Sequence, residues 1–148
     1  MLGYKYASDT HNPRGDNMDE NPTFKAGLAV RKAVLGEEYV SNSLANADDF
    51  TGPLQQYLTE HAWGAVWVRE GLTRKTRSML NLAMLTALNR PNELKLHIKG
   101  AINNGVTKEE MREIFLQCAV YCGAPAGLDS FKIAQQVFKE EAAKAAQS

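Results

Sequence analysis

Apolar residues recur at helical spacing along most of the chain after residue 23, and no stretch alternates apolar and polar positions between turn signals. This pattern predicts an all-α fold, a compact bundle of six to seven helices in a single domain over residues 23–148. Residues 1–22 are polar and contain two prolines, which predicts a flexible or extended arm.

Turn and capping residues divide the pattern into helices. Gly36 and Gly105 are suited to end helices, and Thr73 is suited to begin one. Thr107 and Glu110 form a T-x-x-E capping box ahead of another. The predicted helices cover residues 24–35, 54–68, 73–89, 92–104, 107–122 and 125 onward.

Two of these helices carry expectations about burial. Residues 79–88, with the sequence MLNLAMLTAL, are apolar nearly all round, which predicts a place in the middle of the core. Tyr57, Trp63 and Trp67 are spaced to share one side of their helix. We expect these aromatic side chains to belong to a core or an interface.

Composition excludes several classes of partner. Lys and Arg number 17 and Asp and Glu number 17, so nothing in the net charge favours nucleic acid. A near-neutral chain favours self-association. No apolar run approaches the ~20 residues that a membrane span needs. The start of the chain has no apolar signal region either, so we expect a cytoplasmic protein with no membrane partner.

His97 is the first candidate for chemistry. It lies on or beside the apolar stripe that contains Leu94 and Ile98, and Glu93 precedes it by one helical turn. A carboxylate beside an imidazole fixes its tautomer and raises its basicity, which prepares a general acid or base. The alternative is a core histidine satisfied by its helix neighbour, and periodicity alone favours that alternative.

The cysteines and arginines give weaker indications. Cys118 and Cys122 form C-x-x-x-C late in a helix, where the dipole does not lower a thiol pKa, so two buried thiols are expected. A metal site that includes His97 lacks a fourth ligand. Arg69 and Arg77 lie on either side of the turn at Gly71, and arginine provides planar, permanent donors for carboxylates. Their alternative role is an internal ion pair.

Three blocks in order resemble the carboxymuconolactone decarboxylase family: EHAWGAVWVREGLTRKTRSMLNLAMLTAL, NELKLHIKGAINNGVTKEEMREI and AVYCGAPAG. Upstream, GLAVRKAVLGEEYVSNSL is similar to the first segment of the decarboxylases of protocatechuate degradation. The resemblance implies an alkylhydroperoxidase D-like fold and a homo-oligomer, a hexamer built as a trimer of dimers.

The related peroxidases use an E…C-x-x-C-x-x-x-H site. Aligned through His97, their two cysteines fall at Arg90 and Glu93 and their glutamate falls at Ser78, so only the histidine is present. The missing C-x-x-C argues against a thiol peroxidase.

The resemblance implies cofactor-free decarboxylation of 4-carboxymuconolactone, a lactone dicarboxylate, to 3-oxoadipate enol-lactone and carbon dioxide. No cofactor or metal is expected, because the unsaturated lactone accepts the electrons itself. The implied catalytic residues are His97, which delivers a proton, Glu93, which orients it, and Arg77. The implied substrate-binding residues are Arg69, Lys75, Trp67 and Glu60, the last with a buried ion pair as its alternative.

Two other functions stay open on the sequence. One is a decarboxylase of a related lactone or β-keto acid. The other is a non-catalytic helical assembly or ligand-binding protein on the same scaffold.

Overall fold

A computed structural model describes residues 21–147, and this range is almost entirely helical and contains no strand. The all-α class is therefore confirmed. Residues 1–20 of the predicted arm lie outside the described range, whereas Asn21 and Pro22 already belong to the start of a helix. Contacts group the residues up to Gly71 in one compact unit and those from Leu72 in a second, and each unit is considered by itself.

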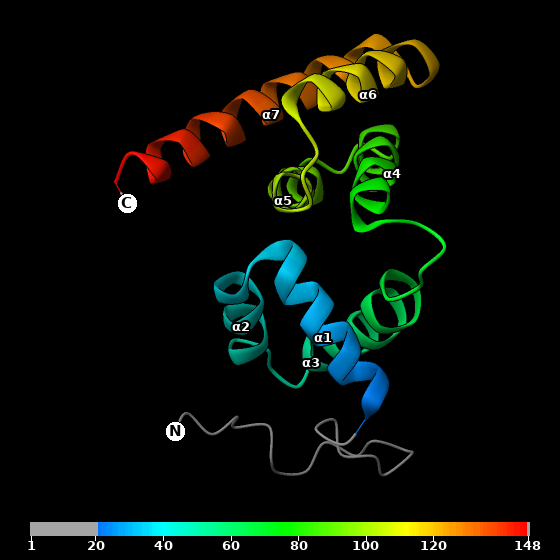
Figure 1. Ribbon diagram of the computed structural model, residues 1–148, viewed down its shortest axis with the longest axis vertical. Helices are drawn as coiled ribbons and strands as arrows, with labels where there is room; N and C mark the ends of the chain where they lie inside the picture. The colour runs from blue at the N-terminus through cyan, green and yellow to red at the C-terminus, as the bar shows by residue number, and fades with distance from the viewer. Residues whose placement is uncertain (1–20, 148) are drawn as a thin grey trace. The chain divides into compact units, whose positions relative to one another are not determined.

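The first unit contains four helical segments (Figure 1). They are α1 (Pro22–Leu35), α2 (Glu37–Ala45), α3 (Gly52–Tyr57) and the π-helix η1 (Leu58–Trp67). Asn21 caps α1, because its side-chain oxygen accepts from the backbone N–H groups of Thr23 and Phe24. Gly36, at φ 93°, ends α1 where the sequence predicted.

α1 and η1 pack closely because each helix has a glycine at the contact, Gly27 in α1 and Gly64 in η1. A Cβ atom on Gly27 would collide with the Thr59 carbonyl oxygen, and one on Gly64 would collide with the Thr23 carbonyl oxygen. Trp63 and Trp67 are buried, at 6% and 8% exposure, but Tyr57 is 60% exposed. The prediction that all three aromatics share one side was wrong for Tyr57, because it precedes Trp63 by six positions and this spacing is not a whole number of helical turns.

The second unit contains α4 (Arg74–Ala87), α5 (Pro91–Asn103), α6 (Lys108–Tyr121) and α7 (Ala124–Ala145). α4 packs against α5 and α6, and the long α7 packs against the same two helices (Figure 1). A shared core fills the space between them. Its largest buried side chains are those of Leu82, Leu94, Ile98, Met111, Phe115 and Val137.

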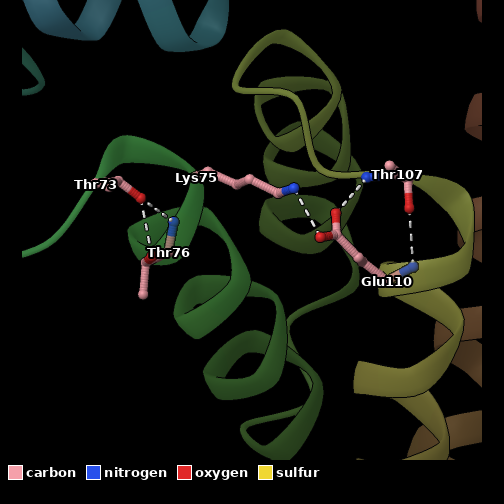
Figure 2. Close-up of polar contacts among 5 residues, drawn as sticks. All are labelled: Thr73, Lys75, Thr76, Thr107 and Glu110. Carbon is pink, nitrogen blue, oxygen red and sulfur yellow. Dashed lines mark hydrogen bonds and ion pairs between the residues drawn. The ribbon is translucent and has the colours of Figure 1, made fainter.

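The caps predicted from sequence are present in the second unit (Figure 2). The Thr73 hydroxyl oxygen accepts from the backbone N–H of Thr76 at 3.1 Å. Thr107 and Glu110 form the capping box, and Glu110 also pairs with Lys75 at 2.7 Å. One carboxylate therefore caps α6 and ties its start to the first turn of α4.

The composition of residues 79–88 predicted that α4 is buried on all sides, but the structure buries only one side of it. Leu82 is fully buried, but Leu80, Met84 and Leu88 are 48%, 52% and 67% exposed and form one stripe along α4. The prediction was wrong because α4 has neighbours on only part of its circumference within its unit. Within residues 21–147 no helix is long and apolar enough to cross a membrane.

Candidate functional site

His97 is positioned by the packing of α5. Pro91 begins this helix, and Leu94 and Ile98 bury its apolar face in the core of the second unit. His97 lies at the edge of that face and is partly buried. The helix therefore holds the imidazole firmly at one side, while the ring remains beside polar neighbours.

Asn81 on α4 is the polar neighbour that meets the ring. Its amide nitrogen, Nδ2, lies 3.4 Å from His97 Nδ1, at the long end for a hydrogen bond. An amide NH₂ can only donate, so His97 Nδ1 accepts. The neutral ring consequently carries its proton on Nε2, which leaves an N–H donor on the other side of the imidazole.

The protonation of His97 reflects two opposing effects. Burial lowers the pKa of His97 below its ordinary value, and the negative charge of Glu93 raises it. The effect of burial is the larger, so the neutral imidazole is the resident form at neutral pH. Glu93 itself is exposed, and it acts on His97 through its charge.

A polar line along α4 continues from Asn81 toward the start of the helix. Arg77 precedes Asn81 by one turn and is partly buried. Ser78 is buried, and its hydroxyl oxygen accepts from Asn104 Nδ2 at 2.9 Å. The buried hydroxyl is thus satisfied inside the unit.

Lys75 lies at the same end of α4, but its ammonium group is paired with Glu110. A contact between Lys75 and substrate would require this ion pair to open. Its substrate-binding role therefore stays a prediction.

The remaining predicted site residues belong to the first unit. Glu60 in η1 is partly buried, and its carboxylate accepts from Gln56 Nε2 at 2.9 Å. Trp67, at the end of η1, stacks on Trp63 with ring centroids 4.8 Å apart. Arg69 follows η1 and is exposed. Their part in substrate binding stays a prediction.

The structure brings together three polar groups of the second unit: His97, Glu93 and Asn81. Helical spacing in the sequence indicated the first two but not Asn81. A signal was present, because Asn81 is the one amide in the otherwise apolar run MLNLAMLTAL. Its partner could not be read from that run, since the two residues are on different helices.

The two cysteines differ in their surroundings. Cys118 is buried, and burial raises the pKa of its thiol. Cys122 is exposed, so the expectation of two buried thiols was wrong for this residue. α6 ends at Tyr121, and Cys122 therefore follows the last turn instead of packing within it. Across residues 21–147 no group of three or more His, Cys, Asp or Glu side chains is arranged to hold a metal ion.

Comparison with known proteins agrees with these observations. A sequence model described as the "Carboxymuconolactone decarboxylase family" matches residues 52–136. The chain is 45% identical to the 4-carboxymuconolactone decarboxylase of Acinetobacter baylyi over 83% of this chain and 92% of that protein. It is 50% identical to the nitrosuccinic acid decarboxylase of Metarhizium robertsii over 79% of this chain and 82% of that protein.

A third relative is a Pseudomonas putida sequence, also named 4-carboxymuconolactone decarboxylase. It is 45% identical over 32% of this chain and 98% of its own length. The match of the family model over more than half of the chain, together with relatives matched over most of their length, shows that this protein belongs to the carboxymuconolactone decarboxylase family.

Proposed function

We propose that this protein decarboxylates 4-carboxymuconolactone to 3-oxoadipate enol-lactone and carbon dioxide without a cofactor, in the degradation of aromatic compounds through protocatechuate. The observation that carries the proposal is the 45% identity to the Acinetobacter baylyi enzyme of that name over 92% of its length. The arrangement of His97, Asn81 and Glu93 supports it, because it supplies the hydrogen-bond donor that this reaction needs.

The reaction needs a site for negative charge more than it needs a strong base. The bond between the γ carbon of the lactone and its carboxylate breaks, and carbon dioxide leaves. The electron pair moves through the ring double bond to the lactone carbonyl oxygen, which becomes an oxyanion. A proton added at the α carbon then restores the carbonyl and leaves the double bond in its new position. Donors aimed at the oxyanion lower this barrier.

His97 is suited to that donor role. Its Nδ1 accepts from Asn81, so Nε2 carries the proton of the neutral ring, and the lactone oxygen is the acceptor that we propose for it in the complex with substrate. Burial lowers the pKa of His97, and the neutral imidazole keeps Nδ1 as the acceptor for Asn81 while Nε2 donates. Delivery of the proton to carbon by His97, as the sequence analysis expected, would need the imidazolium, which the charge of Glu93 favours.

Arg77 is the proposed carboxylate anchor of the second unit. It lies one turn from Asn81 on α4, and guanidinium groups bind carboxylates through two parallel hydrogen bonds. The acetate arm that stays on the product is the natural partner, because it is not consumed in the reaction. Anchoring this arm would fix the position of the ring relative to His97.

A nitro dicarboxylate is the second candidate substrate, favoured by the 50% identity to the nitrosuccinic acid decarboxylase. In nitrosuccinate the carboxylate on the nitro-bearing carbon leaves as carbon dioxide, and the electron pair moves into the nitro group. A nitronate forms there, and a proton on carbon completes the reaction. Both substrates are dianions in which another part of the molecule takes up the electron pair left by carbon dioxide. The same hydrogen-bond donor, His97, and the same carboxylate anchor, Arg77, could therefore act on either substrate.

We also propose a cytoplasmic homo-oligomer, with the hexamer of three dimers implied by the family resemblance. The exposed stripe of Leu80, Met84 and Leu88 supports self-association, because a partner would remove this apolar surface from water. The exposed free thiol of Cys122 supports a reducing compartment. Light scattering on the wild type and on Met84→Glu measures the assembly. An equal mass for both proteins would contradict the role given to the stripe.

The function is tested with substrate made in place from protocatechuate by a dioxygenase and a cycloisomerase. Carbon dioxide release and enol-lactone formation above the spontaneous rate are the expected result, and a parallel reaction tests nitrosuccinate. His97→Gln should lower kcat/KM by about 100-fold or more. His61→Gln is the matched control, because His61 is exposed on η1. Its ring contacts that of Tyr57, with the two ring centroids 4.5 Å apart. A folded protein that releases no carbon dioxide from either substrate would refute the proposal.

A further inference from the structure

Arg31 is a buried cation in the first unit. It lies on α1 and is 5% exposed, and within residues 21–147 it is the only charged side chain in the buried interior. Burying a charge is costly unless it is paired and hydrogen-bonded. A guanidinium remains protonated at any physiological pH, although burial lowers the pKa of Arg31 and the nearby Tyr39 hydroxyl acts in the opposite direction.

The described groups that accept from the Arg31 guanidinium are neutral. Nη1 donates to the Thr59 hydroxyl oxygen at 3.0 Å, and Nη2 donates to Gln55 Oε1 at 2.7 Å. The Nε–H group is buried and has no acceptor among the described residues. None of the ion pairs within residues 21–147 involves Arg31. Among the described residues of this unit, the charge and at least one strong donor are thus left unmatched.

The position of Arg31 is built into the helix contact. Gly27 precedes it by one turn on the same face of α1, and its missing side chain allows the backbone of η1 to come close. Thr59 is fully buried at that contact and donates its own hydroxyl proton to the Gln55 carbonyl at 2.8 Å. Its oxygen is therefore left to accept from Arg31. A π-helix forms one wall, and such segments are frequent at functional sites.

We infer that Arg31 forms a carboxylate-binding site within the first unit, which takes a small dicarboxylate of the chemical class of the proposed substrate. A carboxylate matches the guanidinium in charge and in geometry, because its two oxygens accept from Nε and from a second N–H in parallel. Gln55 is only partly buried, and its side chain covers Nη2. The anion enters where the Gln55 amide moves aside. The substrate assignment rests on the proposed function.

The test measures binding without turnover. Succinate is titrated into the wild-type protein at constant ionic strength, with chloride as the compensating salt, and Kd and melting temperature are recorded. Succinate should raise the melting temperature above the chloride reference. Arg31→Met should weaken succinate binding more than about tenfold, and Arg31→Lys by about tenfold, since lysine keeps the charge but loses the fork. Lys32→Met is the control, because Lys32 is the neighbouring cation and pairs with Glu37.

Stability separates a binding role from a structural one. If Arg31 serves binding, Arg31→Met should melt at the same or a higher temperature without succinate, because a buried charge has been replaced by an apolar chain. If Arg31→Met does not fold, Arg31→Lys carries the test alone. Unchanged succinate binding in the variants, or no response of the wild type beyond that to chloride, would overturn the inference. The inference would also be overturned if Arg31→Met no longer assembled while its succinate binding stayed unchanged. That result would mean that a carboxylate of a second copy pairs with Arg31.

The inference and the proposed function fail in different ways. A wild type that binds succinate through Arg31 but releases no carbon dioxide would keep the binding site and refute the decarboxylation. A wild type that turns over 4-carboxymuconolactone, with succinate binding unchanged in Arg31→Lys, would keep the function and refute the site.

Discussion

Asn81 on α4 and His97 on α5 meet through a contact of 3.4 Å between Asn81 Nδ2 and His97 Nδ1. The contact is possible because α4 and α5 pack against each other around Leu82, Leu94 and Ile98. It decides which ring nitrogen carries the proton, and hence what His97 presents to a ligand. Catalytic hydrogen bonds are often long before substrate binds, and this one is expected to shorten on binding.

Removing the Asn81 amide should therefore damage catalysis more than folding. In Asn81→Ala we expect kcat/KM to fall by about 10-fold to 100-fold, because His97 Nδ1 loses the donor that selects the Nε2–H tautomer. Nitrogen NMR of the imidazole should show a mixture of tautomers in the variant. Gln117→Ala removes an amide from an exposed position on α6 and should change neither measurement. An unchanged tautomer in Asn81→Ala would contradict the assignment.

The pH dependence of activity distinguishes the two roles of His97. Protonation of Nδ1 removes the acceptor of the Asn81 contact that positions the ring, so we expect full turnover only above the pKa of His97, which burial places below the ordinary value of ~6.5. The rate should then rise with pH and reach a plateau. Glu93→Gln removes the charge that raises this pKa, so the rising limb should move to lower pH. Glu109→Gln, at an exposed position on α6, is the control. A rate that falls as pH rises through this region would instead identify His97 as a general acid.

Glu140 should make stability depend on pH in the acid range. Its carboxylate joins α7 to α5 through Lys95 at 2.6 Å and Lys99 at 2.9 Å. These two lysines lower the pKa of Glu140 from 4.5 to about 2. Because the folded state binds the proton less tightly than the unfolded state, the contribution is complete above pH 4.5 and is lost as pH falls toward 2.

The comparison of wild type with Glu140→Gln in urea tests this dependence. The variant should have the lower midpoint at pH 7, and the difference should narrow below pH 4.5 and disappear near pH 2. Glu141→Gln is the control, since Glu141 pairs with Lys144 of the same helix at 3.5 Å. A difference that stays constant down to pH 2 would show that the ion pairs are not its source.

Gly127 should be required for the close approach of α6 and α7. A Cβ atom at this position would lie 2.5 Å from the Ala119 Cβ. Gly127→Ala is expected to lower the free energy of unfolding by about 1–3 kcal/mol, the usual cost of overpacking. Adding Ala119→Gly should recover part of this loss in a double-mutant cycle. Gly71→Ala adds a methyl group in open space and should have little effect, and an equal loss in both single variants would argue against the contact.

The local features of this protein could be predicted from its sequence. The caps at Thr73 and Thr107, and the helix end at Gly36, depend on residues within one turn of each other, so the chain order already specifies them. The all-α class follows from the same short-range periodicity. The pairing of Glu93 with His97 was also predictable, because both residues lie one turn apart on one helix.

The tertiary structure decided what depends on neighbours from other helices. It selected Asn81 as the partner of His97 and buried Arg31 beside Thr59, and both contacts join residues that are far apart in the chain. It also left Leu80 exposed and Leu82 buried within one apolar run, because only one side of α4 is covered. Periodicity shows which residues share a face of a helix, but packing determines which face meets another helix. A polar side chain gains a partner from another helix, and the pKa shift caused by burial, only when the helices pack.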